Sequence, residues 1–593
     1  MGTFALQEKY GHEMPPQVFI PYKEVLTLYR KGLAVPDDVT LMWTDDNYGY
    51  MQHLPTPQER ERSGGNGLYY HASYWGRPHD YLWLGSQSPY LMACELTRAY
   101  YSGIHKVWVL NVGDIKSLEY QLSLFADLAW DINCLSLLQP ALAVKQPEFA
   151  TLAEKDVYDT ALRNALTASA DSASALSAAS AASAALTAPA SAATTVTTAA
   201  TTATAGTLAP AAAATTVAHT YELPHLLATA TWGVKDHLQS FYQEFLPADM
   251  AKQAADLVNE FYRLSFRRKP EFMGNTREEE EDAAWRQIKD LPFSAELTAK
   301  LIAKHQAQLT AADDFFSQVP AALQDCVYEF IVYPVKAGAL LSLKMLTAME
   351  DRHNGGDFSR SDAAFDEINA LTRRYNSGFH NNGKFNKMMD AQPRLLPVFD
   401  PLRDRRHAKT PLPAALQLAA QVNGSDFTGT WALPGLGYKQ QAAFIPQQGL
   451  AQGRLPLNLR LKRSDVSLTE QAWEVQVHFL PTFSGQGESL RVKVSLLDTK
   501  GQASCARTFD LQTHGRSERW KENVLNNRTS CVLAVPLAMV VKLLRHGEPL
   551  QLTIAPLDDG VILDEVYLTL GAKASSQQST LRAPEKQCTE SSA

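Results

Sequence analysis

Four short runs of sequence decide how this chain folds. They are Tyr22-Lys23-Glu24-Val25, Trp43-Thr44-Asp45-Asp46-Asn47, Leu68-Tyr69-Tyr70-His71-Ala72-Ser73-Tyr74 and Trp108-Val109-Leu110-Asn111-Val112-Gly113-Asp114. Each forms or follows an apolar β-type segment that ends in carboxylate, amide, imidazole or phenol groups. Helical patterns separate the later runs. Strands that carry polar residues at their C-terminal ends and are joined by helices predict a (β/α) barrel with a site at its top face.

The pattern accounts for only part of a barrel. We predict strands over 17–21, 39–43, 68–74 and 106–112, and helices over 24–31, 89–101 and 117–130. That is about four strand–helix units, whereas a closed barrel needs eight. An open half-barrel would expose two sheet edges. We therefore expect residues 1–135 to be the C-terminal half of a (β/α)8 catalytic barrel, which is truncated at its N-terminus or needs another chain.

Composition excludes several classes of protein. The net charge of −8 argues against a general nucleic-acid binder. The six cysteines form no C-x-x-C motif or Cys/His cluster, so we expect no metal, and a Cys505–Cys531 disulfide is less favoured than free buried thiols. No signal peptide is visible after Met1, and no run has the length and hydrophobicity of a membrane span. No residue pattern calls for a cofactor.

The pattern of apolar residues changes twice in the rest of the chain. We predict a helical bundle over 136–400, interrupted at 164–217 by a disordered Ala/Ser/Thr-rich insertion. Short alternating segments then predict a β-sandwich over 425–572, followed by a disordered tail over 573–593. The predicted fold class is therefore multidomain: a partial α/β barrel, an all-α bundle and an all-β sandwich.

Several acids could carry chemistry. Glu24 lies at a predicted strand end, where a carboxylate can act as general acid or base, although the first turn of a helix also favours an acid. Asp45, Asp46 and Asn47 are poor strand formers that would bind sugar hydroxyls or make a turn. Asp114 would line the pocket or, as we favour, cap the helix that follows.

Aromatic groups complete the candidate pocket. Tyr69 and His71 share one face of a strand by its period of two, and a bend after Ser73 could bring Tyr74 to them. Aromatic faces stack on sugar rings, while phenol and imidazole groups bind hydroxyls or a carboxylate. These residues are also compatible with a core, but together beside a glycine-rich loop they favour a sugar pocket, and hence a glycoside hydrolase.

These residues, in this order, resemble glycoside hydrolase family 115, the xylan α-1,2-glucuronidases. The resemblance is strong over about 1–165 and looser over much of 218–572. It is carried by Gln17-Val18-Phe19-Ile20-Pro21-Tyr22-Lys23-Glu24-Val25, Trp43-Thr44-Asp45-Asp46-Asn47-Tyr48-Gly49, Arg62-Ser63-Gly64-Gly65-Asn66-Gly67-Leu68-Tyr69-Tyr70-His71 and Asn111-Val112-Gly113-Asp114-Ile115-Lys116. Weaker similarity lies in Gly383-Lys384-Phe385-Asn386-Lys387-Met388-Met389 and Trp431-Ala432-Leu433-Pro434-Gly435-Leu436-Gly437.

The resemblance implies an activity and a set of roles. The family removes glucuronic acid, or its 4-O-methyl ether, from xylan or glucuronoxylan oligosaccharides with inversion. It implies Glu24 as one catalytic carboxylate, and a uronate pocket lined by Tyr22, Asn47, Tyr69, His71 and Tyr74. Asp45, Asp46 and Asp114 are further pocket candidates. Family members are often exported and dimeric, so the resemblance also implies a homodimer and a periplasmic or secreted protein.

One departure limits the expected activity. The family's partner aspartate and an arginine come from barrel strands that would precede Met1, and one carboxylate cannot be both acid and base in an inverting reaction. We therefore predict that the chain is the C-terminal portion of an α-glucuronidase and is inactive or nearly so alone. The alternative is a non-catalytic carbohydrate-binding remnant.

Overall fold

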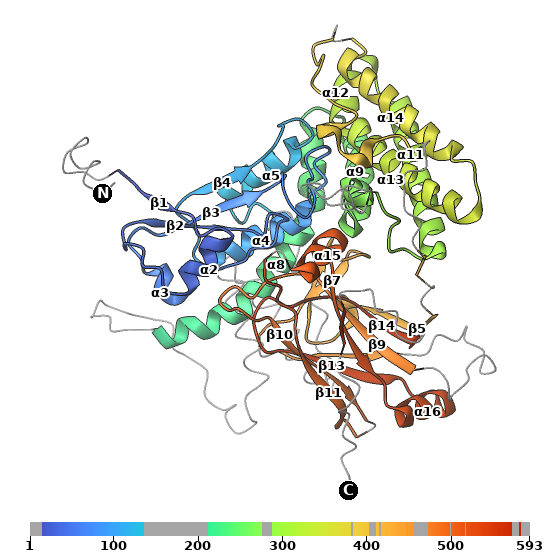
Figure 1. Cartoon of the computed structure of the whole chain (residues 1–593). Coiled ribbons are helices and arrows are strands. Elements are labelled where there is room, and N and C mark those ends of the chain that lie inside the picture. The colour runs from blue at the N-terminus through green and yellow to red at the C-terminus, as the bar shows by residue number, and fades with distance from the viewer. Residues whose placement is uncertain are drawn as a thin grey trace, which may run out of the picture. The chain divides into compact units, whose positions relative to one another are not determined.

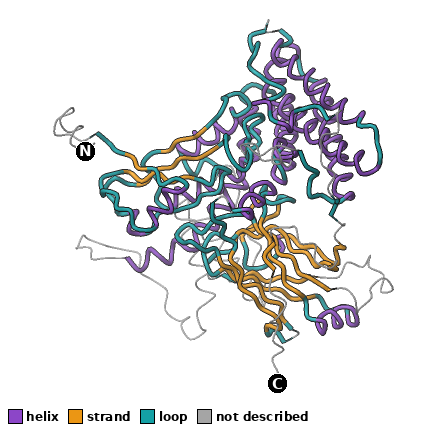
Figure 2. The backbone as a smooth tube through the Cα atoms, viewed as in Figure 1, coloured by secondary structure: helices purple, strands orange, loops and turns teal. Residues whose placement is uncertain are grey.

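The structure is a computed structural model, and it describes residues 15–135, 212–274, 288–380, 383–402, 411–413, 417–447, 449–455, 472–498, 500–515, 517–571 and 580–582. The chain divides into two compact units, Met1–Gln139 with Leu226–Ala593, and Pro140–His225. The second unit lies almost wholly outside the described residues, and all the described strands belong to the first unit. Figures 1 and 2 show its helices and strands, which give a mixed α/β architecture.

A four-stranded parallel sheet begins the first unit. Its strands are β1 (Val18–Phe19), β2 (Thr40–Thr44), β3 (Asn66–His71) and β4 (Trp108–Asn111), and they lie in space in the order of the sequence. Four helices follow the strands, namely α2 (Glu24–Arg30), α3 (Pro57–Arg60), α4 (Pro89–Tyr101) and α5 (Glu119–Trp130). All four carboxyl ends therefore meet at one edge of the sheet, as parallel pairing requires.

The last strand and its helix correct two expectations. The apolar run at 106–112 predicted a buried strand, yet all four residues of β4 are half-buried because β4 ends the described sheet. Asp114 was favoured as a helix cap, but α5 begins only at Glu119, and its cap position is Leu118, which makes no side-chain capping hydrogen bond. Ser117, at φ 71°, turns the chain away before the helix starts, so Asp114 lies outside it.

Helices make up most of the described residues between 212 and 400. They are α8 (Ala212–Gln243), α9 (Ala248–Arg267), α11 (Ala295–Ser317), α12 (Gln324–Val327), a π-helical turn (Tyr328–Val332), α13 (Tyr333–Asn354) and α14 (Ser359–Ser377). Short 3-10 turns cover Pro270–Gly274, Ala321–Leu323, Pro393–Leu395 and Pro397–Phe399. We did not predict α14 as a separate helix, although its buried residues Ala364, Ile368, Thr372 and Tyr375 recur three or four positions apart.

The stretch Ala321–Asn354 corrects another expectation. Among the described residues it is long and apolar enough to span a membrane, although no such run was expected from the sequence. Within the fold, however, 89% of its apolar window is buried. Burial by neighbouring helices is what a core helix of a globular domain requires.

Two β-sheets make up the C-terminal region. The strands are β5 (Gln417–Asn423), β6 (Trp431–Pro434), β7 (Gln441–Phe444), β8 (Ala451–Leu455), β9 (Ala472–Phe479), β10 (Arg491–Leu497), β11 (Ala503–Asp510), β12 (Thr529–Ala534), β13 (Leu550–Pro556), β14 (Ile562–Gly571) and β15 (Thr580–Arg582). One sheet has the order β11-β10-β13-β8 and is antiparallel, and the other has the order β15-β12-β9-β14-β7-β6, with β5 also paired to β14. Apolar side chains from both sheets enter one continuous core.

Two helices and two cysteines complete this region. The helices are α15 (Glu518–Asn526) and α16 (Leu537–His546). Cys505 lies in β11 and Cys531 in β12; both are buried, and the less favoured disulfide between them is not formed.

Some predictions fall partly outside the described residues. Residues 164–211 of the predicted insertion, residues 456–471 of the predicted sandwich and most of the predicted tail are not described. The described ends differ from the expected disorder. Residues 212–217 belong to α8, and residues 580–582 form β15, whose backbone extends the sheet beside β12.

Candidate functional site

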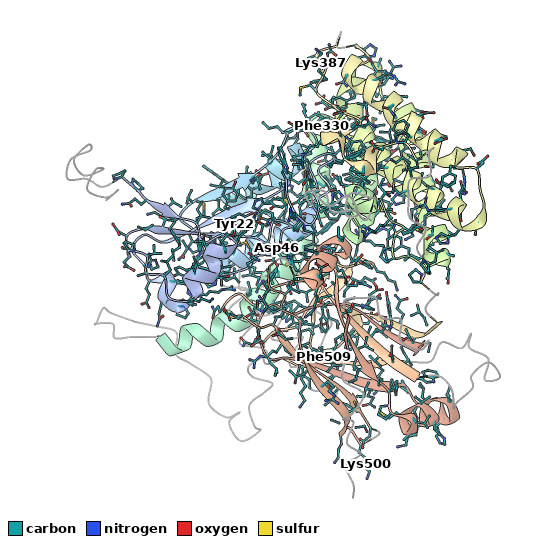
Figure 3. All side chains as sticks on the ribbon, in the orientation of Figure 1. Tyr22, Asp46, Phe330, Lys387, Lys500 and Phe509 are labelled. Carbon is teal, nitrogen blue, oxygen red and sulfur yellow. The ribbon has the colours of Figure 1, made fainter. Side chains whose placement is uncertain are left out.

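The parallel sheet gathers six of the predicted site residues at its carboxyl edge. Tyr22 follows β1, Asp45 and Asn47 follow β2, and His71 ends β3 just before Tyr74. Their rings lie close together: the Tyr22 and His71 centroids are 6.2 Å apart and stacked, and those of His71 and Tyr74 are 5.5 Å apart. Figure 3 shows Tyr22 on this blue, N-terminal part of the ribbon.

A buried acid orients His71. Its Nδ1 lies 2.5 Å from Oδ1 of Asp45, and both residues are buried, Asp45 completely. The other carboxylate oxygen of Asp45 accepts a hydrogen bond from the Gly49 amide at 2.8 Å. Because the carboxylate can only accept, it holds the proton on Nδ1, and Nε2 remains the atom of His71 that can meet a ligand.

Two tyrosines fix Asn47 from opposite ends. The Tyr22 hydroxyl donates to Oδ1 of Asn47 at 2.5 Å, and the Tyr81 hydroxyl donates to the Asn47 carbonyl at 2.6 Å. Asn47 has φ 77°, a left-handed conformation that asparagine adopts more readily than most residues. Its Nδ2 is left as a donor without a hydrogen bond to another described residue.

The surroundings keep Tyr22 protonated. Burial, followed by its closeness to Tyr74 and to the charge of Asp45, raises the pKa of Tyr22 well above its usual range. A neutral phenol at ordinary pH donates one hydrogen bond and accepts others. The Tyr22 hydroxyl is therefore a fixed polar group of the site and not an acid that titrates.

Lys23 adds a positive charge that sequence analysis missed. Its Nζ donates to the Tyr74 hydroxyl at 3.0 Å and lies 4.7 Å from the centroid of the Tyr22 ring. Lys23 has φ 53° and ψ −120°, so the chain bends sharply between β1 and α2. The motif contains this lysine, but no pattern in the sequence shows that its side chain folds back over the two tyrosines.

Tyr69 is the sixth residue of the group. Its ring centroid lies 5.3 Å from that of His71, and its hydroxyl accepts a hydrogen bond from Nδ2 of Asn111 at 2.8 Å. Asn111 ends β4, so this contact ties the fourth strand to the cluster. We call Tyr22, Asn47, Tyr69, His71, Tyr74, Asp45 and Lys23 the edge cluster.

Two of the predicted acids lie at the surface. Glu24 is the exposed first residue of α2 and makes no hydrogen bond or ion pair with another described residue. A free, exposed carboxylate directly after Tyr22 and Lys23 is available to a ligand. Asp114 is exposed in the loop after β4 and is not joined to the edge cluster by any hydrogen bond within the described part of the chain.

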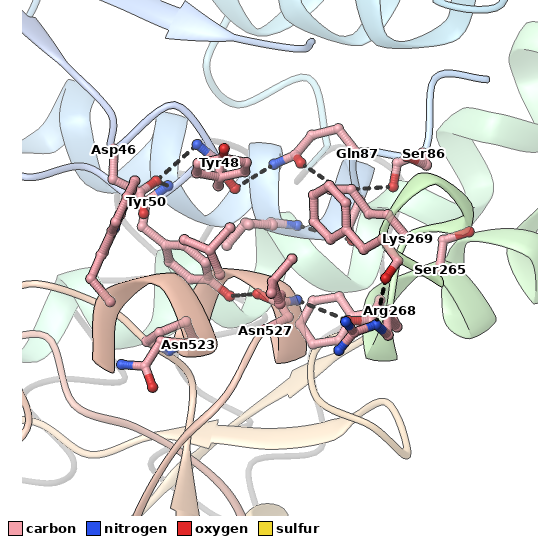
Figure 4. A pocket seen from close by; sticks show the side chains of 18 residues that line it. Asp46, Tyr48, Tyr50, Ser86, Gln87, Ser265, Arg268, Lys269, Asn523 and Asn527 are labelled. Atoms are coloured by element: carbon pink, nitrogen blue, oxygen red, sulfur yellow. Dashed lines mark hydrogen bonds between the residues drawn. The ribbon is translucent and has the colours of Figure 1, made fainter. Parts of the chain in front are cut away.

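Asp46 lines a pocket that contains none of the other predicted site residues. Its Oδ1 accepts hydrogen bonds from the amides of Tyr48 and Tyr50 at 2.9 and 3.2 Å. Figure 4 shows it lining a narrow pocket together with residues of α9 and α15. Burial and then the charge of Asp45 raise the pKa of Asp46 to about 8. The two neighbouring aspartates thus serve different sites.

Within the part of the chain that the structure describes, no group of three or more His, Cys, Asp or Glu side chains is placed to hold a metal ion. What the edge cluster offers is a combination of aromatic faces, hydrogen-bond donors and one ammonium group. Such a combination suits an anionic sugar.

Comparisons with known proteins agree on one family. A family model described as glycosyl hydrolase family 115 matches residues 5–177, and no curated protein matches the chain. Twelve chains of solved structures match. One is a family GH115 4-O-methyl-α-glucuronidase, BtGH115A, with specificity for decorated arabinogalactans; it is 36% identical, with a TM-score of 0.72.

The two chains differ in length. The match covers 96% of the present chain and 60% of the glucuronidase, so the chain spans about three fifths of the length of that relative. The family model and the solved relative point the same way, and the family model covers the whole edge cluster. The chain therefore belongs to glycosyl hydrolase family 115.

Proposed function

We propose that the edge cluster is the uronate pocket of an α-glucuronidase, which removes glucuronic acid or its 4-O-methyl ether from xylan. The observation that carries this proposal is the convergence of Lys23, His71 and Asn47 at the carboxyl edge of a parallel sheet. Their donors suit the carboxylate and hydroxyls of a uronic acid. Membership of the family and the activity of the solved relative support it.

The roles follow from the chemistry of each group. Lys23 supplies positive charge, and Nε2 of His71 donates to the uronate carboxylate or accepts from a hydroxyl, depending on its protonation. Nδ2 of Asn47 donates to a ring hydroxyl. The faces of Tyr22 and Tyr74 exclude water around the ring and keep these polar contacts strong.

Glu24 is proposed as one of the two catalytic carboxylates. In an inverting reaction an acid protonates the leaving oxygen while a base roughly 6.5–9.5 Å away activates water. Asp45 is unsuited to the second role because it is fully buried and already bound to His71 and the Gly49 amide. We propose that the partner carboxylate lies outside the described residues, and that this chain alone has little or no hydrolytic activity.

We also propose how the described elements group into domains. The four parallel strands and their helices would be half of a (β/α)8 barrel over 1–135. The helices to residue 400 would form a bundle, and the two sheets of 425–572 a β-sandwich. A homodimer and export remain proposals from family resemblance.

Two measurements test the proposal. Calorimetric titration of the wild-type chain with glucuronic acid should give binding that His71→Ala and Lys23→Ala weaken, while galactose, which lacks the carboxylate, should bind poorly. Release of 4-O-methylglucuronic acid from glucuronoxylan should be absent or weak. Equal binding of glucuronic acid by the wild type and both variants would refute the uronate pocket.

A second candidate function follows because Glu24 supplies one carboxylate, whereas an inverting reaction needs two. A carbohydrate-binding remnant would bind the uronate as tightly but never hydrolyse it. Proton NMR of the reaction distinguishes the enzyme from the binding remnant. Hydrolysis that first yields the β-anomer of the released uronic acid, and that is lost in Glu24→Gln, supports an inverting enzyme. Efficient turnover by this chain would overturn our placement of the partner carboxylate.

A further inference from the structure

A tryptophan at the surface lies next to the edge cluster. Trp75 directly follows Tyr74, and its side chain is 64% exposed. Exposing a side chain of this size forgoes the free energy that its burial would provide. An exposed indole ring beside the proposed uronate pocket is therefore a candidate ligand contact.

The loop that carries Trp75 is closed at its base. Tyr74 and Tyr81 pair as an antiparallel bridge, with amide-to-carbonyl distances of 3.3 and 3.1 Å. The Gly76 amide donates to Oδ1 of the buried Asp80 at 2.8 Å. The Tyr74 ring packs directly over Gly76, where a Cβ atom would collide with it. The loop is thus a small, well-bonded unit.

Arg394 supports the tryptophan from another part of the chain. Its guanidinium carbon lies 4.0 Å from the centroid of the Trp75 ring, and it forms an ion pair with Asp80. A planar guanidinium stacks on an aromatic face while its edge binds a carboxylate. Asp80 therefore holds both the loop and the cation that backs the ring. Such support lowers the entropy lost when a ligand stacks on Trp75.

We propose that Trp75, backed by Arg394, is the platform for the neutral pyranose that carries the uronate. This inference rests on the proposed function and adds a subsite to it. A debranching enzyme must contact the sugar on the far side of the scissile bond, and that sugar has no charge for Lys23 or His71 to recognise. A stacked indole ring recognises the apolar face of such a ring without requiring charge.

The test compares two ligands by calorimetry on the full chain. One is glucuronic acid, and the other is an oligosaccharide in which the uronate is linked to xylose. Trp75→Ala should weaken binding of the oligosaccharide about tenfold, as expected for the loss of one stacked aromatic ring, and leave glucuronic acid within about twofold. Trp75→Phe should restore most of the loss.

The chain contains a matched control. Trp130 is 93% exposed and ends α5, so Trp130→Ala removes an exposed indole at the end of that helix remote from the sheet's carboxyl edge. It should change neither affinity. Arg394→Lys keeps the charge beside Asp80 but removes the planar stack, and should weaken only the oligosaccharide.

The outcomes separate the two proposals. Unchanged binding of the oligosaccharide by Trp75→Ala, or equal loss for both ligands, would overturn the platform while leaving the uronate pocket intact. Failure of the wild type to bind glucuronic acid would overturn the pocket and the platform with it. A parallel titration with a galactose-based oligosaccharide shows which neutral sugar the platform prefers.

Discussion

Asp46→Asn should stabilise the protein at neutral pH, and the effect should disappear in acid. The side chain is 4% exposed, and its pKa in the folded protein is raised from 3.8 to about 8, first by burial and then by the charge of Asp45. Asparagine has nearly the same shape and keeps an oxygen to accept from the Tyr48 and Tyr50 amides.

The sign follows from where the proton is bound. Below pH 3.8 Asp46 is protonated in both states and contributes no pH dependence. As pH rises from about 4 to 8, the unfolded chain loses this proton and the folded protein keeps it, so stability falls. At pH 7 the solution is about 3 pH units above the pKa of Asp46 in the unfolded chain, and one unit corresponds to about 1.4 kcal/mol. The penalty that asparagine removes is therefore about 4 kcal/mol.

The assay is a pH series of urea unfolding for the wild type and Asp46→Asn. The difference between their midpoints should grow from pH 4 to pH 8 and level off above it. Asp38→Asn, an exposed acid before β2, is the control and should show no such growth. A difference that does not change with pH would refute the reasoning. So would an infrared difference spectrum between wild type and Asp46→Asn at pH 6.5 that shows no loss of carboxylic-acid absorbance. A difference spectrum is needed because burial also raises the pKa of Glu95 and Glu271.

Two further predictions concern the same loop. In Asp45→Asn the side-chain oxygen should keep its hydrogen bond from the Gly49 amide, so the new NH2 group faces Nδ1 of His71 and the imidazole proton moves to Nε2. Nitrogen NMR of the imidazole should report the changed tautomer, and retention of the Nδ1–H form would contradict the assignment. Gly49→Ala should destabilise the protein by about 3 kcal/mol, because Gly49 has φ 99° and a Cβ atom would lie 2.8 Å from the Tyr70 hydroxyl. A urea unfolding midpoint close to that of the wild type would contradict this prediction and show that the loop relaxes.

The parallel strands were predictable because apolar runs and polar ends coincide in the sequence. Each predicted strand from residue 17 to 112 is present within a few residues, and α4 covers Pro89–Tyr101 as expected. The C-terminal strands β5 to β8 and β11 were not predicted. They are rich in Ala, Gln and Arg, and their strand character comes from pairing with neighbours far along the chain.

The candidate site was predictable in composition and less so in geometry. From the sequence we placed Asp45 and Asp46 in one pocket. Successive residues of an extended chain point to opposite faces, and accordingly Asp45 contacts His71 whereas Asp46 lines a different pocket. The position of Lys23 depends on a backbone conformation that no residue type specifies. The support of Trp75 by Arg394 depends on a contact between residues more than 300 positions apart, which local sequence patterns cannot reveal.

Asn527 forms hydrogen bonds to two distant parts of the chain, so domain boundaries drawn along the sequence do not separate independent folding units. It caps α15 in a left-handed conformation, accepts from the Tyr50 hydroxyl at 2.6 Å and donates to the Phe266 carbonyl at 3.0 Å. Three stretches that would be assigned to separate domains thus depend on one amide. A chain trimmed before this residue would leave both partners unsatisfied. The loop that carries Asn47 and Tyr50 would then lose its hydrogen bond to the C-terminal region, so this region supports the backbone on which the edge cluster is built.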